Sequence, residues 1–331
     1  MKAVVLAGGY ATRLWPITKD RPKILLPVGD TTPLSRLLDD FEADTRIDTV
    51  YVSTNERFAE EFEQFVRDSR FEKPVVSVET TRSEDQKLGV VGALADLIDR
   101  EGIDDDLIVV GGDNLFGFGL DDFVDFFETR NGPCVAVHDI GSRERARAYG
   151  VVETDGTHVE SFQEKPAHPS SSLVSTACYA LPATVLPSIR RYLSGQTNPD
   201  EPGRYVQWLN ERRSIGAFRF DETWYDIGSP ESYLEAVAWQ SDGGCHIADD
   251  ATVRNSDIGP AVHVMSGAEI VDSSLEHCVV FPSARVADCD LSWSIVDEHA
   301  EVAALAREDL LVGSHTQLTN DRGIADGGRE L

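Results

Sequence analysis

Residues 3–28 read AVVLAGGYATRLWPITKDRPKILLPV, and this stretch decides the fold of the first part of the chain. Its apolar start, residues 3–7, is typical of a buried parallel strand. The pair Gly8-Gly9 ends the strand, and glycine lets a backbone approach a ligand that a Cβ atom would exclude. Arg13 and Lys23 follow as two cations. A strand that ends in glycines and then presents cations indicates a site for phosphate.

The phosphate site is of neither common type. No Gly-Lys-Ser/Thr follows the glycines, which excludes a P-loop, and no G-x-G-x-x-G is present, which excludes a dinucleotide-binding dehydrogenase. Three later segments contain chemistry-bearing residues: GGDN at residues 111–114, EKP at 164–166 and WYDIGSPE at 224–231. Asp113 follows an apolar strand and two glycines, so its carboxylate is expected at the carboxyl edge of a parallel sheet, where ligands collect.

In this order the segments resemble the sugar-phosphate nucleotidyltransferases, whose signature reads LAGGxGTRLxPxTxxxPKxLLPV. Ala11 is the one departure, since the family has a third glycine there. The resemblance covers about residues 1–240 and is nearest to glucose-1-phosphate thymidylyltransferase-like proteins of haloarchaeal type. It implies that a sugar 1-phosphate attacks the α-phosphorus of a nucleoside triphosphate in line and that pyrophosphate leaves.

The resemblance also implies roles for individual positions. Arg13 and Lys23 are the expected catalytic cations, because they would stabilise charge on the reacting phosphates. Asp113 and Asp226 are the expected ligands of Mg²⁺, which prefers oxygen donors; without the family pattern, each would be read as a turn or cap residue. The expected nucleotide-binding positions are Leu6, Gly8, Gly9, Thr12, Gln86 and Gly89. The expected sugar-phosphate positions are Gly150, Glu164, Lys165, Ser175 and Thr176.

The choice of base is open at this point. Gln86 offers the paired donor and acceptor that a pyrimidine edge requires. The following pattern LGVVGAL, residues 88–94, also resembles relatives that use guanine nucleotides, and a solvated loop glutamine is an equal alternative. The first choice of substrates is dTTP with glucose 1-phosphate, followed by UTP and then by GTP with mannose 1-phosphate. A non-catalytic regulatory paralogue is a competing hypothesis.

Hydrophobic periodicity predicts the architecture. Strand-like runs at residues 49–53, 75–78, 107–110 and 134–140 alternate with helical patterns at 58–66, 90–98 and 123–127, and this alternation predicts an α/β domain with helices on both faces of the sheet. We expect a Rossmann-like mixed, mostly parallel sheet in a catalytic domain over residues 1–242. Its nucleotide half covers about residues 1–140. Its sugar-binding half, about 141–242, contains a predicted hairpin at 151–164, a strand at 174–181 and helices at 186–193 and 205–212.

Beyond residue 243 the helical signals stop. Apolar residues recur every five or six positions, and this pattern resembles a left-handed parallel β-helix built on a hexapeptide repeat. The β-helix is expected over residues 243–318. The resemblance implies about 18 residues per coil, so residues 245–312 would hold about four coils; a plain β-meander is the alternative. We expect this segment to form the interface of a homo-oligomer, and residues 319–331 to be a disordered tail. An acetyltransferase activity is disfavoured because His263 and His277 resemble turn or surface residues.

Composition excludes several classes of partner. The formal net charge of −28, with only six lysines among thirty basic residues, argues against nucleic acid and anionic membranes as partners. Such acidity resembles that of proteins from salt-rich cytoplasm. Five dispersed cysteines without C-x-x-C spacing indicate reduced core thiols. No signal peptide or apolar membrane span is recognisable, and the sequence therefore predicts a cytoplasmic protein.

Overall fold

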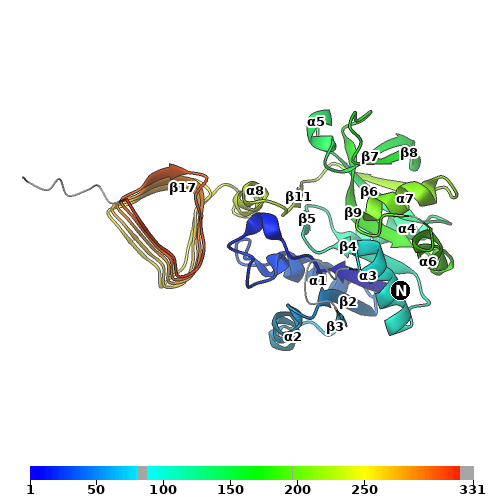
Figure 1. The fold of residues 1–331 in the computed structure, drawn as a ribbon, viewed down its shortest axis with the longest axis horizontal. Coiled ribbons are helices and arrows are strands. Elements are labelled where there is room, and N and C mark those ends of the chain that lie inside the picture. The colour runs from blue at the N-terminus through cyan, green and yellow to red at the C-terminus, as the bar shows by residue number, and fades with distance from the viewer. Residues whose placement is uncertain (81–87, 196, 321–331) are drawn as a thin grey trace, which may run out of the picture. The chain divides into compact units, whose positions relative to one another are not determined.

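The computed structural model describes residues 1–80, 88–195 and 197–320 (Figure 1). Contacts between residues divide the chain into two compact units. The first unit contains Met1–Tyr10, Arg21–Pro27 and Thr31–Asp226. The second contains Ala11–Asp20, Val28–Asp30 and Ile227–Leu331. The predicted disordered tail lies outside the described residues apart from its first two positions.

The first unit is built on a nine-stranded sheet in the order β3-β2-β1-β4-β9-β6-β10-β8-β7. Its strands are β1 (Lys2–Leu6), β2 (Thr49–Asn55), β3 (Pro74–Glu79), β4 (Leu107–Gly111), β6 (Cys134–Asp139), β7 (Gly150–Asp155), β8 (His158–Glu164), β9 (Leu173–Leu181) and β10 (Gly216–Phe220). The pairs β3–β2, β2–β1, β1–β4 and β6–β10 are parallel, and the others are antiparallel. A mixed α/β fold is thus confirmed, with an uninterrupted parallel block in its first half.

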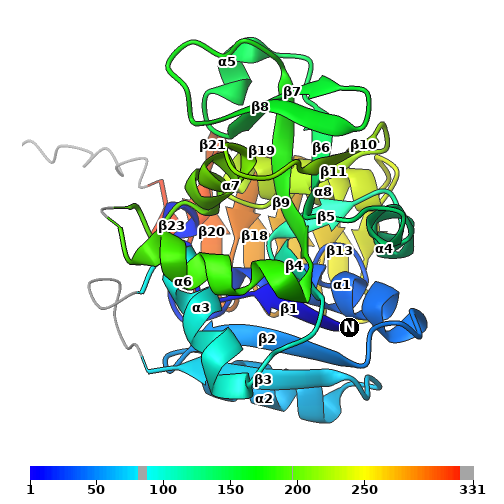
Figure 2. The ribbon, with the colours of Figure 1, turned by 90° about the vertical axis from the view of Figure 1, so that its right-hand side faces the viewer.

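Helices cover both faces of this sheet (Figure 2). They are α1 (Pro33–Ala43), α2 (Ala59–Asp68), α3 (Val90–Glu101), α4 (Leu120–Glu128), α5 (Arg143–Ala146), α6 (Pro187–Leu193) and α7 (Pro202–Asn210), with short 3₁₀ turns at η2 (Lys23–Leu25) and η4 (Ala183–Val185). A separate two-stranded sheet pairs β5 (Asn114–Phe116) with β11 (Trp224–Asp226).

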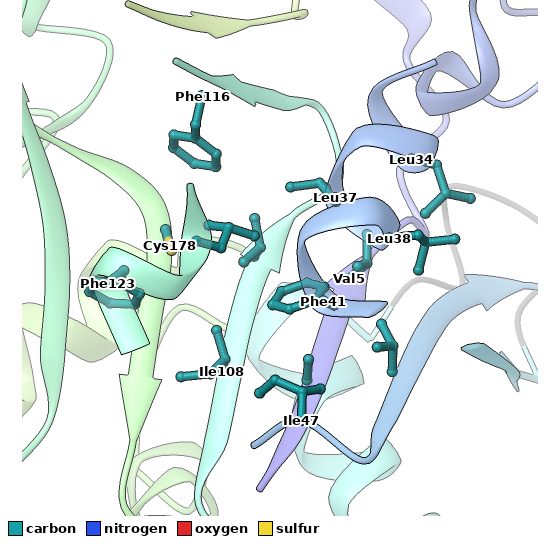
Figure 3. Packing of buried hydrophobic residues seen from close by; sticks show 14 of the residues in the cluster. Val5, Leu34, Leu37, Leu38, Phe41, Ile47, Ile108, Phe116, Phe123 and Cys178 are labelled. Carbon is teal, nitrogen blue, oxygen red and sulfur yellow. The ribbon is translucent and has the colours of Figure 1, made fainter. Parts of the chain in front are cut away.

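Two hydrophobic clusters flank the sheet because successive residues of a strand face opposite sides. On β1, Ala3 and Val5 belong to a cluster with α1, α2 and α4, whereas Val4 belongs to a cluster with α3, α6 and α7. Figure 3 shows part of the first cluster, where Leu34, Leu37, Leu38 and Phe41 of α1 point toward the strands. Their spacing is that of one helical face. Phe62 of α2 and Phe123 and Phe127 of α4 are buried in the same cluster, so these phenylalanines are core residues.

The second unit consists of η1 (Thr12–Leu14), α8 (Pro230–Gln240) and a stack of short parallel strands. The strands are β12 (His246–Ile247), β13 (Thr252–Arg254), β14 (Asp257–Ile258), β15 (His263–Val264), β16 (Glu269–Val271), β17 (Ser274–Val280), β18 (Arg285–Ala287), β19 (Asp290–Val296), β20 (Glu301–Ala303), β21 (Ala306–Glu308), β22 (Leu311–Val312) and β23 (Gln317–Thr319). In Figure 1 they trace a triangular coil.

Each turn of the coil is shorter than the family resemblance led us to expect. The register pairs Thr252 with Glu269, Glu269 with Arg285, and Arg285 with Glu301, so these four residues mark equivalent positions in successive turns. These steps are 17, 16 and 16 residues, so the expected length of about 18 residues per coil is one to two residues too long. Val264 and most of the other predicted apolar steps are buried inside the coil, although Ile247 is exposed.

Corners of the coil adopt the left-handed backbone conformation. The residues with positive φ are Asn255, Ala261, Gly267, Asp272, His277, Ser283, Asp288, Trp293, His299, Ala304, Asp309 and His315. Asn and Asp tolerate this conformation better than most residues, which suits them to corners. His277 stacks on Trp293 with ring centroids 4.5 Å apart. His277 lies within β17 with φ 50° and a partly buried side chain, and His263 is buried in β15, so the expected surface position is wrong for His263.

Four cysteines are buried in the two units, as expected of core thiols, and Cys245 is exposed. Within the described ranges, the structure contains no helix with the length and apolar character required to span a bilayer.

Candidate active site

The carboxyl ends of β1, β2, β3 and β4 lie at one edge of the sheet and position the Gly8-Gly9 loop. The buried side chain of Asn55, at the end of β2, donates from Nδ2 to the Gly8 carbonyl oxygen at 2.9 Å. A Cβ atom on Gly9 would have no neighbour within 4 Å. The loop is thus held by Asn55 and open at Gly9, which suits the approach of a ligand to its backbone. Leu6 accepts a hydrogen bond from the Gly112 amide at 2.9 Å, which joins the loop to β4.

The remaining nucleotide positions differ in how they are placed. Gly89 is the N-cap of α3 with φ +75°, and a Cβ atom there would lie 2.5 Å from the carbonyl carbon and oxygen of Pro199. Gln86 lies outside the described residues. Thr12 and Arg13 are in η1 of the second unit, where Arg13 is exposed. Ala11, the N-cap of η1, has φ 49° and ψ 41°, a left-handed conformation that explains why glycine suits this position of the signature.

Lys23 and Asp113 form an ion pair, although they are 90 residues apart in the sequence. Asn114 donates from Nδ2 to the other carboxylate oxygen of Asp113 at 3.1 Å and to the Gly111 carbonyl at 2.9 Å. A Cβ atom on Gly111 would lie 2.6 Å from Asn114 Nδ2. The glycine at the end of β4 therefore makes room for the amide that orients the carboxylate.

Asp226, the last residue of β11, lies beside the Asp113-Asn114 segment. The register of the small sheet pairs Asp226 with Asn114, so Asp226 is opposite the immediate neighbour of Asp113. Two carboxylates placed in this way, with phosphate oxygens and water completing the shell, are a donor set that fits Mg²⁺. Among the described residues no group of three or more His, Cys, Asp or Glu side chains could hold a metal ion. Substrate oxygens would therefore have to supply part of the coordination.

Trp224 connects the carboxylate pair to the second half of the site. Its indole Nε1 donates to Asn114 Oδ1 at 2.7 Å, and its ring meets the ring of Tyr149 edge-on with centroids 5.4 Å apart. The Tyr149 carbonyl oxygen in turn accepts a hydrogen bond from the Lys165 amide at 3.0 Å. A contiguous chain of contacts therefore runs from Asp113 to Lys165 within the first unit.

Glu164 sits between two glycines. Gly150 pairs with Glu164 in the β7–β8 register, and a Cβ atom on Gly150 would lie 2.9 Å from Glu164 Oε2. On the side of α7, a Cβ atom on Gly203 would lie only 1.7 Å from the same oxygen. Burial raises the pKa of Glu164 above its ordinary value, opposed by the nearby Lys165 cation. The amide nitrogen of Glu164 is satisfied by Gln207 Oε1 at 3.2 Å.

Lys165 takes a left-handed backbone conformation, with φ 46°. Its Nζ atom donates to Glu201 Oε1 at 2.8 Å, and the side chain is about half exposed. Ser175 is buried on β9, which pairs with β7 beside it. Thr176 is fully buried and donates to the Ala136 carbonyl oxygen at 3.2 Å, beside an irregularity in the β6–β9 register.

The structure thus brings Lys23, Asp113 and Asp226 together, and likewise Gly150, Glu164 and Lys165. Residues that sequence reasoning gave no role are Asn55, Asn114, Glu201, Gly203 and Trp224. Asn114 and Trp224 stood inside recognised motifs, and their hydrogen-bonding side chains near an aspartate were the available signal. Glu201 and Gly203 had none, since Lys165 and Glu164, the site residues that they approach, are more than 35 positions away in the chain.

Comparison of the sequence with known proteins finds two relatives at 30% identity. A glucose-1-phosphate thymidylyltransferase of Streptomyces griseus is 30% identical over 360 aligned positions, which cover 99% of this chain and 96% of that protein. A protein of Sulfolobus acidocaldarius described as a mannose-1-phosphate guanyltransferase is 30% identical over 239 positions, 71% of this chain and 61% of that protein.

The fold also has a counterpart of known structure. A crystal structure of a UDP-glucose pyrophosphorylase complexed with UDP-glucose matches with a TM-score of 0.63 at 22% identity, and it covers 73% of this chain and 98% of that one. The profile of one family matches residues 2–243, which include all the residues of the site described above. The chain therefore belongs to the nucleotidyl transferase family.

Proposed function

We propose that the protein joins a nucleoside triphosphate to a hexose 1-phosphate and releases pyrophosphate. The observation that carries this proposal is the Lys23–Asp113 ion pair, held by Asn114 at the sheet edge where the open Gly8-Gly9 loop also begins. A cation and carboxylates beside an accessible backbone loop suit a triphosphate with a divalent ion. The preferred substrates are dTTP and glucose 1-phosphate, which would give dTDP-glucose.

The chemistry requires positioning and charge stabilisation. An oxygen of the sugar phosphate forms a bond to the α-phosphorus while the bond from that phosphorus to the β-phosphate oxygen breaks. The attacking oxygen is already ionised, so no general base is needed. Lys23 would stabilise charge at the α-phosphate, and the family signature assigns the departing phosphates to Arg13. Mg²⁺ bound by Asp113 and Asp226 would supply Lewis-acid stabilisation of the phosphate oxygens.

The sugar would be held by the second group of residues. Glu164 would accept hydrogen bonds from sugar hydroxyls, and the glycines beside its carboxylate, Gly150 and Gly203, fix its position. Lys165 would bind the sugar phosphate. Ser175 lies on β9 next to Thr176. The hydrogen bond from Thr176 to the Ala136 carbonyl oxygen favours a structural role for the Thr176 hydroxyl. Tyr149 and Trp224 would keep this group in register with the carboxylate pair.

A panel of substrates tests the proposal. The purified protein is incubated with Mg²⁺, each of dTTP, UTP and GTP, and glucose or mannose 1-phosphate, and pyrophosphate release is measured. The relatives named above favour both the thymidylyl and the guanylyl reaction, so the base is decided by the rates. Release with one pair well above the others supports the proposal. No release with any pair would favour the regulatory paralogue, with Ala11 as its only sequence correlate.

The second part of the chain supports a separate proposal. We infer a catalytic domain over residues 1–242, with nucleotide and sugar halves meeting near residue 140, and a left-handed β-helix of the hexapeptide type over residues 243–318. Parallel pairing of each turn with the next, at a nearly constant interval in the sequence, and left-handed corners favour this interpretation. Such a coil has open ends, which an identical subunit would cover. Light scattering on the full chain and on a chain ending near Gly243 tests the interface: a full-length monomer at micromolar concentration would contradict it.

The composition supports the remaining proposals. The protein would act in the cytoplasm of a salt-adapted cell, because carboxylates dominate its charge. Its product, a nucleotide-sugar, would supply glycosylation or polysaccharide synthesis.

A further inference from the structure

Three donors converge on the carboxylate of Glu201. Lys165 Nζ donates to Oε1 at 2.8 Å. Arg204 Nε and Asn198 Nδ2 both donate to Oε2 at 3.2 Å. Two cations and an amide around one pair of oxygens form the arrangement that binds an anionic group such as phosphate. In this structure the anion is a side chain of the protein itself.

Capping of α7 does not explain the position of the Glu201 side chain. Glu201 is the N-cap residue of α7, yet its side chain makes no capping hydrogen bond. Ser, Thr, Asp or Asn at an N-cap would normally satisfy an amide of the first turn. The carboxylate is directed at the cations instead, and the hydrogen bond from Lys165 lowers the pKa of Glu201, as expected of an ionised partner.

The backbone beneath this cluster is fixed. The carbonyl oxygen of Pro199 accepts a hydrogen bond from the Val91 amide at 2.8 Å, and the Glu201 carbonyl accepts one from the Arg204 amide at 3.0 Å. The Glu201 side chain, in contrast, has three rotatable bonds and is partly exposed. A rotation of this side chain would vacate the donors without any change of the main chain.

The charges of the cluster also balance. Lys165 and Arg204 carry two positive charges, and Glu201 with the neighbouring Glu164, 4.0 Å from Lys165, carries two negative ones when both are ionised. A phosphate dianion would therefore enter a neutral group of side chains. When the charge of Glu201 turns away, the site becomes more positive and attracts the phosphate.

We propose that Glu201 occupies the phosphate position of the hexose 1-phosphate site, and that the sugar phosphate displaces it to bind Lys165, Arg204 and Asn198. The inference rests on the proposed function, since it assigns Lys165 to the sugar phosphate. It adds Arg204 and Asn198 as ligands of that phosphate and makes Glu201 an internal competitor that sets the apparent affinity.

Two substitutions, Glu201→Gln and Arg204→Gln, are expected to change the affinity for glucose 1-phosphate in opposite directions. Glu201→Gln keeps the size and the acceptor oxygen but removes the charge. It is expected to lower the KM and the calorimetric Kd for glucose 1-phosphate by about three- to tenfold, the range of a half-exposed ion pair. Arg204→Gln is expected to raise both constants. Glu211→Gln is the matched control, because Glu211 is the C-cap of the same helix and pairs with Arg212; its constants should equal those of the wild type.

The outcomes separate this inference from the proposed function. An unchanged or raised Kd in Glu201→Gln, in a protein whose circular dichroism matches the wild type, would overturn the inference, since Glu201 would then be irrelevant or would position Lys165. Unchanged constants in Arg204→Gln would remove Arg204 from the site. A wild-type protein that binds and converts no hexose 1-phosphate would instead refute the proposed function.

Discussion

The substitution Gly203→Ala should lower the free energy of unfolding in the wild type and raise it in a Glu164→Ala background. The added methyl group would lie 1.7 Å from Glu164 Oε2 and 2.5 Å from its Cδ atom, well inside contact distance. The carboxylate has little room to retreat, because it is buried and the Gly150 position also lies close to Glu164 Oε2. Glu164 must therefore shift in the Gly203→Ala variant, and with it the expected contact to the sugar.

Helix propensity and overpacking contribute to the change in unfolding free energy with opposite signs. Alanine is more favourable than glycine inside a helix by about 1 kcal/mol. Overpacking a buried site costs about 1–3 kcal/mol. In the wild-type background the free energy of unfolding should therefore fall by up to ~2 kcal/mol. In a Glu164→Ala background there is no carboxylate to displace, and Gly203→Ala should stabilise the protein by about 1 kcal/mol.

Urea denaturation of the four proteins in this double-mutant cycle measures the coupling. The KM for glucose 1-phosphate, measured in parallel, should rise at least ~10-fold in Gly203→Ala, as expected for a loss of about 1.4 kcal/mol of binding. Gly195→Ala is the control, since its methyl group would meet only ordinary contacts 3.5 Å away. A stability change of the same sign and size in both backgrounds would refute the close approach of Gly203 to Glu164.

Four further variants and changes of pH, metal and salt test the other proposed roles. Gly9→Ala places a methyl group in open space, so it should leave the melting temperature unchanged and raise the KM for the nucleoside triphosphate; an unchanged KM would remove Gly9 from the nucleotide site. Asp113→Asn and Asp226→Asn should each abolish turnover in a folded protein, with partial recovery at high Mg²⁺, and full wild-type activity in EDTA would contradict the metal assignment. Because burial raises the folded-state pKa of Glu164 above its ordinary value of 4.5, the folded state binds the extra proton, and its contribution to stability is lost as pH rises through the folded pKa. The unfolding free energy of wild type should consequently fall more between pH 4.5 and 7 than that of Glu164→Gln, and equal falls would refute the shift. Molar KCl should raise the melting temperature, since it screens the net charge of −28; a temperature independent of salt would leave the acidity without this explanation.

Long apolar runs made much of the first unit predictable. The β4 run is buried at every position, and the helical spacing on α2, α3 and α4 is regular, so each was recognisable from the sequence. β10 was missed because GAFRF begins with glycine and contains an arginine, and only its place between β6 and β8 makes it a strand. β5 and β11 are too short for any period to show.

Some residues of the candidate site were predictable from sequence motifs, and others depend on tertiary packing. Lys23 and Asp113 were predicted because each stands in a recognisable motif. Their ion pair joins η2, which follows β1 in the chain, to the residues that follow the neighbouring strand β4. The roles of Gly203 and Glu201 depend on how α7 packs beside β8, which no local pattern encodes. For the length of each turn of the coil, the sequence contained the correct signal and the family resemblance misled. The spacing of apolar positions was visible in the sequence, and three such steps make the turn that the register shows, whereas the longer expected turn came from the family resemblance.

In the proposed reaction, the phosphate of a hexose 1-phosphate attacks the nucleotide and is retained in the product. Glucose 1-phosphate labelled with ¹⁸O in its phosphate is incubated with the protein, dTTP and Mg²⁺, and the masses of the products are measured by mass spectrometry. We predict that the label appears entirely in the nucleotide-sugar, formed in equal amount to unlabelled pyrophosphate. Pyrophosphate without a labelled nucleotide-sugar, for dTTP and also for UTP and GTP with glucose or mannose 1-phosphate, would contradict the account.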